Sequence, residues 1–137
     1  MNKPFIIFTV LLIITSCVGK KSTFDQNGNI QKLGTPNKVE YYKHFEGKAF
    51  QYSDTATFVI NDHQELESVI NEIKNADNPE LWKGAGWDRI KIYYIDTVLT
   101  INTNNKKIGT GSSGTFYDLE KNNFITKRIS KKQETKQ

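Results

Sequence analysis

The clearest periodic pattern in the chain lies over residues 62–75, where apolar residues recur at helical spacing. Asp62, with Glu65 three residues later, forms a capping-box pattern at the start of this segment. The pattern predicts one amphipathic helix over about residues 62–75, with its apolar side packed on a sheet. The residues at positions i, i+3, i+4 and i+7 of that side are Leu66, Val69, Ile70 and Ile73.

Several other segments are rich in β-branched and aromatic residues or alternate between apolar and polar positions, as strands do. Between them, Asp96-Thr97, Asn104-Asn105 and the segment 121–123 are typical of turns. We therefore predict an α+β fold, in which the helix packs on a curved antiparallel sheet or meander. The predicted strand segments are 39–52 (one or two short strands), 55–60, 89–95, 98–103, 106–108, 115–119 and 124–129.

The length of 137 residues allows one domain, and shifts in composition indicate its limits. Residues 17–37 contain three glycines, a proline and many polar residues, which predicts a flexible linker. We expect the folded domain to span residues 38–129. The basic segment 130–137 is expected to be a disordered tail.

The net charge of +4 and the pI of about 9.1 come from the ends of the chain. Between Cys17 and Thr126 there are 13 basic and 14 acidic residues, so the body of the protein is close to neutral. A basic tail is not the clustered basic face that nucleic-acid binding requires. We therefore expect no nucleic-acid partner.

The N-terminal segment has one cation, Lys3, followed by an apolar run over residues 5–14. Ten helical residues span about 15 Å, roughly half of the hydrocarbon core of a bilayer. The run is too short for an ordinary transmembrane helix and is typical of the apolar region of a secretory signal peptide. We predict that residues 1–16 are a signal peptide that is cleaved.

The apolar run ends in Ile14-Thr15-Ser16-Cys17, which contains the only cysteine of the chain. These residues resemble the lipobox of bacterial lipoproteins, in which an aliphatic residue and two small residues precede a cysteine. The resemblance covers the first 17 residues. It implies that Cys17 carries a thioether-linked diacylglycerol and, after cleavage, an N-acyl chain such as palmitate. An ordinary signal peptide followed by a chance or buried cysteine is the alternative.

Two or more acyl chains hold a protein firmly at a membrane without a membrane span. The resemblance therefore implies a lipid-anchored protein of the bacterial cell envelope. In some lipoproteins, acidic residues just after the cysteine direct the protein to the cell surface. Here Val18-Gly19-Lys20-Lys21 follow Cys17, so we expect an outer-membrane protein that faces the periplasm.

The sequence contains few candidates for a site of chemistry. Gly109 to Gly114 matches G-x-G-x-x-G, but a dinucleotide site needs a helix directly after it, whereas a strand is predicted there. We interpret this segment as a mobile loop between strands. The two histidines, His44 and His63, have no metal-ligand spacing, and no G-x-S-x-G motif is present. We predict no catalytic residue, no metal site and no cofactor beyond the lipid on Cys17.

Trp82 and Trp87 flank a short glycine-containing segment, with Lys83 between them. If this loop is exposed, the two indoles and Lys83 are candidates for stacking on a sugar ring or anchoring a protein partner. The alternative is that one or both tryptophans close the core.

The sequence is most consistent with a non-enzymatic binding module, or an inhibitor or immunity-type module, that contacts an envelope protein through exposed loops. Two alternatives remain at this point. One is a small enzyme that acts on an envelope polymer, which would need acidic side chains converging near Trp82 or Trp87. The other is a structural or assembly accessory of the outer membrane.

Overall fold

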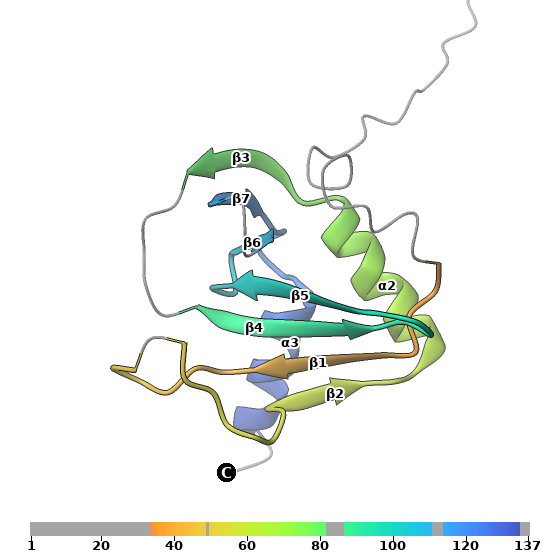
Figure 1. The fold of residues 1–137 in the computed structure, drawn as a ribbon, viewed down its shortest axis with the longest axis horizontal. Helices are drawn as coiled ribbons and strands as arrows, with labels where there is room; N and C mark the ends of the chain where they lie inside the picture. Colours follow the sequence, from red (N-terminus) through yellow and green to blue (C-terminus); the bar gives the residue numbers. More distant parts are fainter. Residues whose placement is uncertain (1–33, 49, 82–86, 111–113, 135–137) are drawn as a thin grey trace, which may run out of the picture.

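The computed structural model describes residues 34–48, 50–81, 87–110 and 114–134. In this part of the chain, seven antiparallel strands form one sheet and two helices pack against it (Figure 1). The α+β class is confirmed. The predicted curvature is not confirmed, because the sheet is not strongly curled. The elements are β1 (Lys38–Tyr42), β2 (Phe58–Ile60), α2 (His63–Lys74), β3 (Asp77–Leu81), β4 (Asp88–Tyr93), β5 (Val98–Thr103), β6 (Lys107–Thr110), β7 (Thr115–Asp118) and α3 (Phe124–Glu134).

The strand order is β2-β1-β4-β5-β6-β7-β3. Strands β2 and β3 are therefore the two edges of the sheet, although only α2 separates them in the chain. Figure 1 shows α2 running across the sheet from one edge towards the other. Within the sheet, Tyr41, Ile90 and Ile101 are aligned on β1, β4 and β5, and all three side chains are fully buried.

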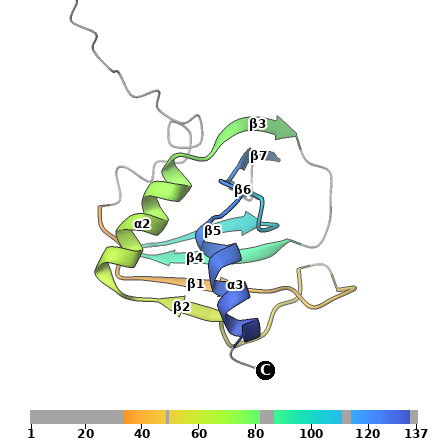
Figure 2. The same ribbon diagram turned by 180° about the vertical axis from the view of Figure 1, so that it is seen from behind.

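Both helices cover the same face of the sheet (Figure 2). The predicted stripe of α2 packs there, since all four of its apolar residues are buried. The predicted cap is also present, because the Asp62 carboxylate accepts a hydrogen bond from the Glu65 backbone N–H at 2.9 Å. Burial of each such side chain stabilises the fold by about 1.5–3 kcal/mol, so the stripe is a main source of the stability of this helix.

The segment after residue 123 corrects two predictions. Residues 124–129 are the start of helix α3 and not the last strand of a hairpin, and residues 130–134 continue this helix instead of a disordered tail. Asn123 begins the helix, because its Oδ1 accepts hydrogen bonds from the backbone N–H groups of Ile125 and Thr126 at 3.0 and 3.2 Å. Asparagine favours turns and helix N-caps alike, which explains why the local pattern predicted a hairpin turn.

Strand β3 is absent from the predicted strand segments, although residues 77–81 form it. Pro79 has no N–H to donate, which is tolerated at a sheet edge. The register with β7 shifts between Asp77 and Glu80. Asn78 adopts a positive φ of 59°, and its side-chain amide donates to Asp118 Oδ2 at 2.6 Å.

Candidate functional site

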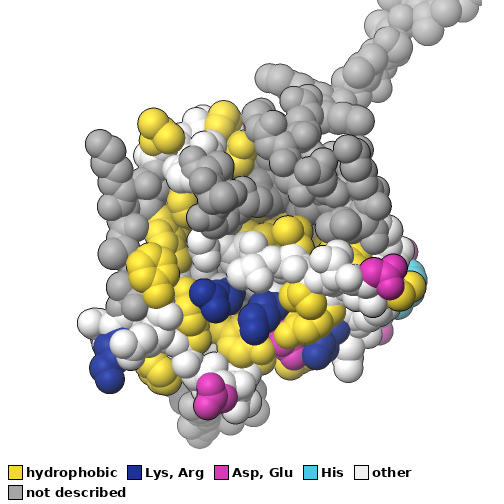
Figure 3. Space-filling view, in the orientation of Figure 1, with side chains coloured by type: hydrophobic (Ala, Val, Ile, Leu, Met, Phe, Trp, Pro, Cys, Tyr) yellow, Lys and Arg dark blue, Asp and Glu magenta, His cyan; other side chains and the backbone are white. Residues whose placement is uncertain are grey.

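One face of the sheet has no helix against it in the described part of the chain (Figures 1 and 2). Alternate residues of β1 and β4 point to this side, in register with one another. In Figure 3, lysine and arginine side chains gather in the middle of this face and are bordered by hydrophobic side chains. We call it the open face and define it by seven half-buried residues: Lys38, Glu40, Tyr42, Tyr52, Arg89, Lys91 and Tyr93.

Cations and aromatic rings are paired across the open face. Each pair places a positive charge over the electron-rich surface of a tyrosine ring, which is worth about 0.5–1 kcal/mol at exposed sites. Three such contacts order the side chains of neighbouring strands and of the segment after β1. The pairs are Lys38–Tyr93, Lys91–Tyr42 and Arg89–Tyr52, with cation-to-ring-centre distances of 4.2, 5.0 and 4.1 Å.

Glu40 is the only acidic residue among the seven that define the open face. It accepts hydrogen bonds from the hydroxyls of Tyr42 and Tyr93 at 2.7 and 2.5 Å and pairs with Lys38 Nζ at 2.8 Å. Partial burial opposes the charged form, but the bonds from Lys38, Tyr93 and Tyr42 outweigh it and lower the pKa of Glu40 to about 2. The hydrogen bond to Glu40 in turn raises the pKa of each tyrosine. The charge of Glu40 is therefore matched by Lys38.

A hollow of about 270 Å³ lies at one end of the open face. Among the described residues, no carboxylate is within ion-pair distance of Arg89 or Lys91. The Nε of Arg89 is buried without a hydrogen-bond partner in the described structure. The hollow thus contains two cations without an ion-pair partner there. Its lining residues are Tyr42, Tyr52, Ser53, Asp54, Arg89 and Lys91.

A buried polar network lies beneath this end of the sheet. The Asp88 carboxylate, on a residue only 5% exposed, accepts a hydrogen bond from the Tyr41 hydroxyl. It also accepts one from the backbone N–H of His44 at 3.0 Å and lies 2.6 Å from His44 Nδ1. Burial and the bond to Asp88 raise the pKa of Tyr41, which keeps the phenol neutral. Because Asp88 is bonded to two neighbours in the fold, we interpret this network as structural.

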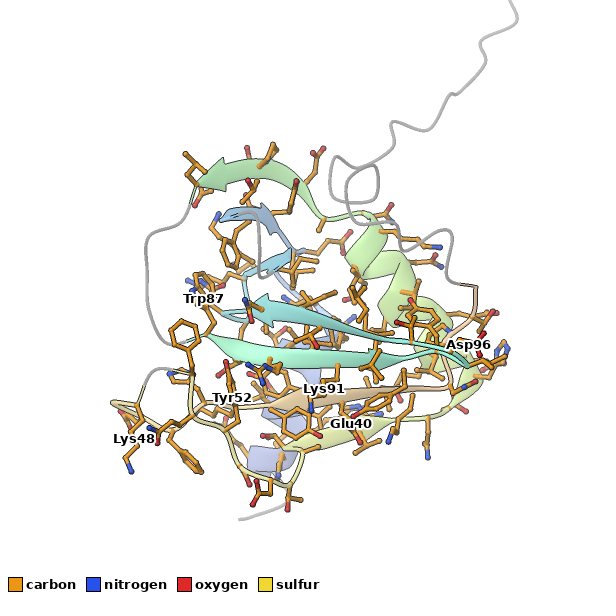
Figure 4. The ribbon with its side chains drawn as sticks, in the orientation of Figure 1. Glu40, Lys48, Tyr52, Trp87, Lys91 and Asp96 are labelled. Carbon is orange, nitrogen blue, oxygen red and sulfur yellow. The ribbon has the colours of Figure 1, made fainter. Side chains whose placement is uncertain are left out.

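The buried network is joined to the hollow through Tyr52. His44 and Tyr52 form a β-bridge, and the Tyr52 hydroxyl donates to the carbonyl of Trp87 at 2.9 Å. Figure 4 shows Tyr52 and Trp87 towards the same end of the sheet, with Lys91 nearer its middle. The contacts of Tyr52 with His44 and with the Trp87 carbonyl therefore fix the position of its ring under Arg89.

Of the three residues predicted to bind a partner, the structure describes only Trp87. Trp87 is buried, with 5% of its surface exposed, and its indole stacks on Phe116 at a centroid distance of 4.1 Å. Its side chain therefore packs against β7 and is not exposed. Trp82 and Lys83 lie outside the described residues, as do Cys17, the predicted signal peptide and most of the predicted linker.

The glycine motif has a packing role at its first position. Gly109 belongs to β6, and a Cβ there would lie 2.7 Å from the backbone oxygen of Thr115 and 2.8 Å from the Phe116 ring. Gly114 has a φ of +64° and leads into β7, which is a strand and not the helix that a dinucleotide site needs. Residues 111–113 are outside the described structure.

The two histidines lie in different parts of the fold and have different neighbours. His63 lies in the first turn of α2, where Nδ1 is 3.6 Å from Glu67, whereas His44 contacts Asp88. Over the described ranges, no group of three or more His, Cys, Asp or Glu residues is placed to hold a metal ion. Neither α2 nor α3 has the length and apolar content of a membrane-crossing helix.

Sequence reasoning did not single out the open face as a site. The alternation of Arg89, Lys91 and Tyr93 with apolar residues was visible, and it correctly predicted a strand with a polar side. The pairing of this side with β1 and the position of Tyr52 depend on strand order, which no local pattern encodes. The sequence did contain one sign of this site: the polar side of the predicted strand 89–95 carries two cations and a tyrosine, which are residue types common at binding surfaces.

No family model, curated protein or solved structure matches this chain.

Proposed function

We propose that this protein is a non-enzymatic binding module anchored by lipid in the bacterial cell envelope, and that the open face is its recognition surface. One observation carries the proposal. The sheet presents tyrosine, arginine and lysine side chains in fixed positions on the side away from both helices. Tyrosine and arginine are the residue types that most often dominate binding energy at interfaces.

The anchor in this proposal is Cys17 of the lipobox, and the outer membrane facing the periplasm is the expected location. A flexible linker of about 20 residues has a typical reach of about 25 Å. The described chain begins beside α2, and the Asn37 N–H donates to the Tyr93 carbonyl at 2.8 Å. That end of the sheet, marked by Asp96 in Figure 4, is opposite the end with Tyr52. The hollow is thus far from the point where the tether joins the domain.

The alternative of an enzyme that acts on an envelope polymer has less support. It requires acidic side chains that converge on a pocket near the tryptophans. Asp88 is the acid next to Trp87, and its oxygens are bonded to Tyr41 and His44. A carboxylate held in this way stabilises the fold and is not placed to attack or protonate a substrate.

The proposal is tested by charge reversal on the open face in the full-length, lipidated protein. We expect chemical crosslinking in intact cells to give a discrete adduct with the wild type that Lys91→Glu loses, because the new acid lies in the middle of the recognition surface. Lys121→Glu, an equal change at an exposed residue next to α3, is the matched control and should keep the adduct.

Two outcomes would contradict the proposal. The first is an adduct that persists in Lys91→Glu as strongly as in the control. The second is the absence of any adduct with the wild type. An adduct of constant stoichiometry with an outer-membrane assembly protein, insensitive to Lys91→Glu, would favour the structural accessory instead.

A further inference from the structure

We infer that the hollow on the open face binds an acidic sugar, meaning a sugar ring that carries a carboxylate. The inference rests on the proposed function and names the class of ligand that this surface recognises. Four features of the hollow carry it: its unmatched cations, its oriented tyrosine rings, the acid in its lining, and its size.

The first feature is positive charge without an internal partner. Arg89 and Lys91 are two residues apart on β4, so their side chains leave the same side of the strand about 7 Å apart. Lys38, the third cation of the open face, is paired with Glu40. A carboxylate from outside fits the fork of a guanidinium group and gains a second charge from a neighbouring ammonium.

The second feature is the orientation of two tyrosine rings. Tyr52 is held by its bond to the Trp87 carbonyl at 2.9 Å, and Tyr42 by its bond to Glu40 at 2.7 Å. Each ring also lies against a cation, Arg89 and Lys91 respectively. Rings held in this way provide rigid apolar surface beside polar groups, which suits a sugar ring with its apolar and hydroxylated sides.

The third feature is Asp54, which favours an anion that also carries hydroxyl groups. A carboxylate in the lining repels any anionic ligand, but hydrogen bonds donated by sugar hydroxyls offset this repulsion, and an acidic peptide lacks these hydroxyls. Ser53 lies beside it, and its oxygen accepts from the Thr55 N–H at 3.1 Å, which leaves the hydroxyl hydrogen free to donate. A lining with two cations, one anion and a hydroxyl complements a ligand that has one negative group and several hydroxyls.

The fourth feature is size. The volume of about 270 Å³ is just below the range of about 300–1,000 Å³ that is usual for drug-sized ligands. The hollow is partly open to solvent, so we expect it to hold a single ring of a longer chain.

The inference is tested with full-length protein in detergent and tetragalacturonate as the probe. Calorimetric titration should show binding of tetragalacturonate and at least about tenfold weaker binding of the neutral tetrasaccharide maltotetraose, because the charge-assisted bonds are lost. Arg89→Gln and Lys91→Gln should each weaken tetragalacturonate binding by about tenfold or more. Lys121→Gln should leave it unchanged.

Asp54→Asn should affect the two ligands differently. We expect it to strengthen the binding of tetraglutamate more than that of tetragalacturonate, because removing the charge relieves repulsion for both ligands, whereas only the sugar loses hydrogen bonds from its hydroxyls to a charged acceptor. This variant also keeps the inference testable if Arg89→Gln fails to fold.

Three results would overturn the inference. They are no binding of tetragalacturonate, equal binding of tetraglutamate by the wild type, or binding that both Arg89→Gln and Lys91→Gln leave unchanged. If tetragalacturonate does not bind while Lys91→Glu still abolishes the cellular adduct, the acidic-sugar assignment fails and the proposed binding function stands.

Discussion

The carboxylate of Glu40 is the one acidic group among the seven residues that define the open face, and its pKa is strongly lowered. Three donors, from Lys38, Tyr42 and Tyr93, converge on it and come from two adjacent strands. Hydrogen bonds to a charged acceptor are stronger than those between neutral groups. Glu40 therefore orders Tyr42, which lines the hollow, and Tyr93, besides balancing the charge of Lys38.

Glu40→Gln is expected to lower the free energy of unfolding by about 1–2 kcal/mol at pH 7, because bonds to a charged acceptor are replaced by weaker ones. The folded pKa of about 2 is below the ordinary value for glutamate, so the stabilisation is complete above the unfolded pKa. It is lost as the pH falls through the folded pKa. Urea denaturation should therefore show that wild type and variant converge between about pH 5 and pH 2.

The control for Glu40→Gln is Glu46→Gln, at an exposed residue of the turn after His44. Its free energy of unfolding should stay within about 0.5 kcal/mol of the wild type at each pH. A difference between Glu40→Gln and wild type that does not change with pH would show that the charge of Glu40 has no role in stability.

Gly109 shows how one residue can fit a motif for an unrelated reason. Its missing side chain leaves room for the Phe116 ring, on which Trp87 stacks. The pattern G-x-G-x-x-G therefore includes a glycine required by packing between β6 and β7. Rejection of a dinucleotide site followed from the predicted strand after Gly114, and β7 confirms that strand.

Among the elements, α2, β4 and β5 were predictable and α3 and β3 were not. The apolar stripe of α2 and the apolar–polar alternation of β4 each lie within one segment of the chain. The local pattern was therefore sufficient to predict these elements. In α3, by contrast, only Phe124 and Ile125 are buried, and the short apolar run was also compatible with a strand. Strand β3 is exposed throughout, so no apolar alternation marked it, and Pro79 argued against it.

Asn123→Ala is expected to reduce the free energy of unfolding by about 2–4 kcal/mol. The variant removes the N-cap of α3, which contributes about 1 kcal/mol. It also removes two donated hydrogen bonds, to the carbonyls of Asn105 and Glu120 at 2.7 and 2.9 Å. Urea denaturation followed by circular dichroism measures the loss.

The matched control is Asn122→Ala, at the exposed neighbouring position. A change within about 0.5 kcal/mol is expected there. Similar small losses in both variants would mean that residues 121–123 act only as a connecting turn, as the hairpin prediction assumed.

Across the molecule, one chain of polar contacts joins segments that are distant in sequence. His44 and Tyr41 bond to Asp88, the Tyr41 hydroxyl also lies 2.9 Å from Asn105 Oδ1, and Asn123 donates to the Asn105 carbonyl. This chain links β1, β4, the β5–β6 turn and the start of α3. The hollow lies next to the His44 end of this chain of contacts, because His44 pairs with Tyr52 of its lining. The network therefore supports the proposed site from below.

The proposed attachment of the protein to a membrane is tested at Cys17. We expect mass spectrometry of membrane-derived protein to find a mature N-terminus at Cys17 that carries diacylglycerol and an N-acyl chain. Cys17→Ala has no thiol to carry the lipid, so we expect this variant to leave the membrane fraction. The physical reason is that each buried CH₂ of an acyl chain contributes about 0.8 kcal/mol to membrane binding. Ser22→Ala, in the predicted linker, is the control and should keep the proposed anchor.

A soluble mature protein that begins at another residue would contradict the lipobox interpretation. Cys17 would then be an ordinary thiol. The open face and its hollow would remain candidates for a binding site, since they depend on none of the first 33 residues.

The sequence by itself determined the elements whose apolar pattern is complete within a single segment, and with them the α+β class. It also contains the lipobox resemblance, because that signal is read along the chain. Only the tertiary structure decided the strand order, the helical state of residues 124–134 and the assembly of Arg89, Lys91, Tyr42 and Tyr52 around one hollow. The physical reason is that these features depend on contacts between residues far apart in the chain, where local propensity is weak or fits two structures equally well.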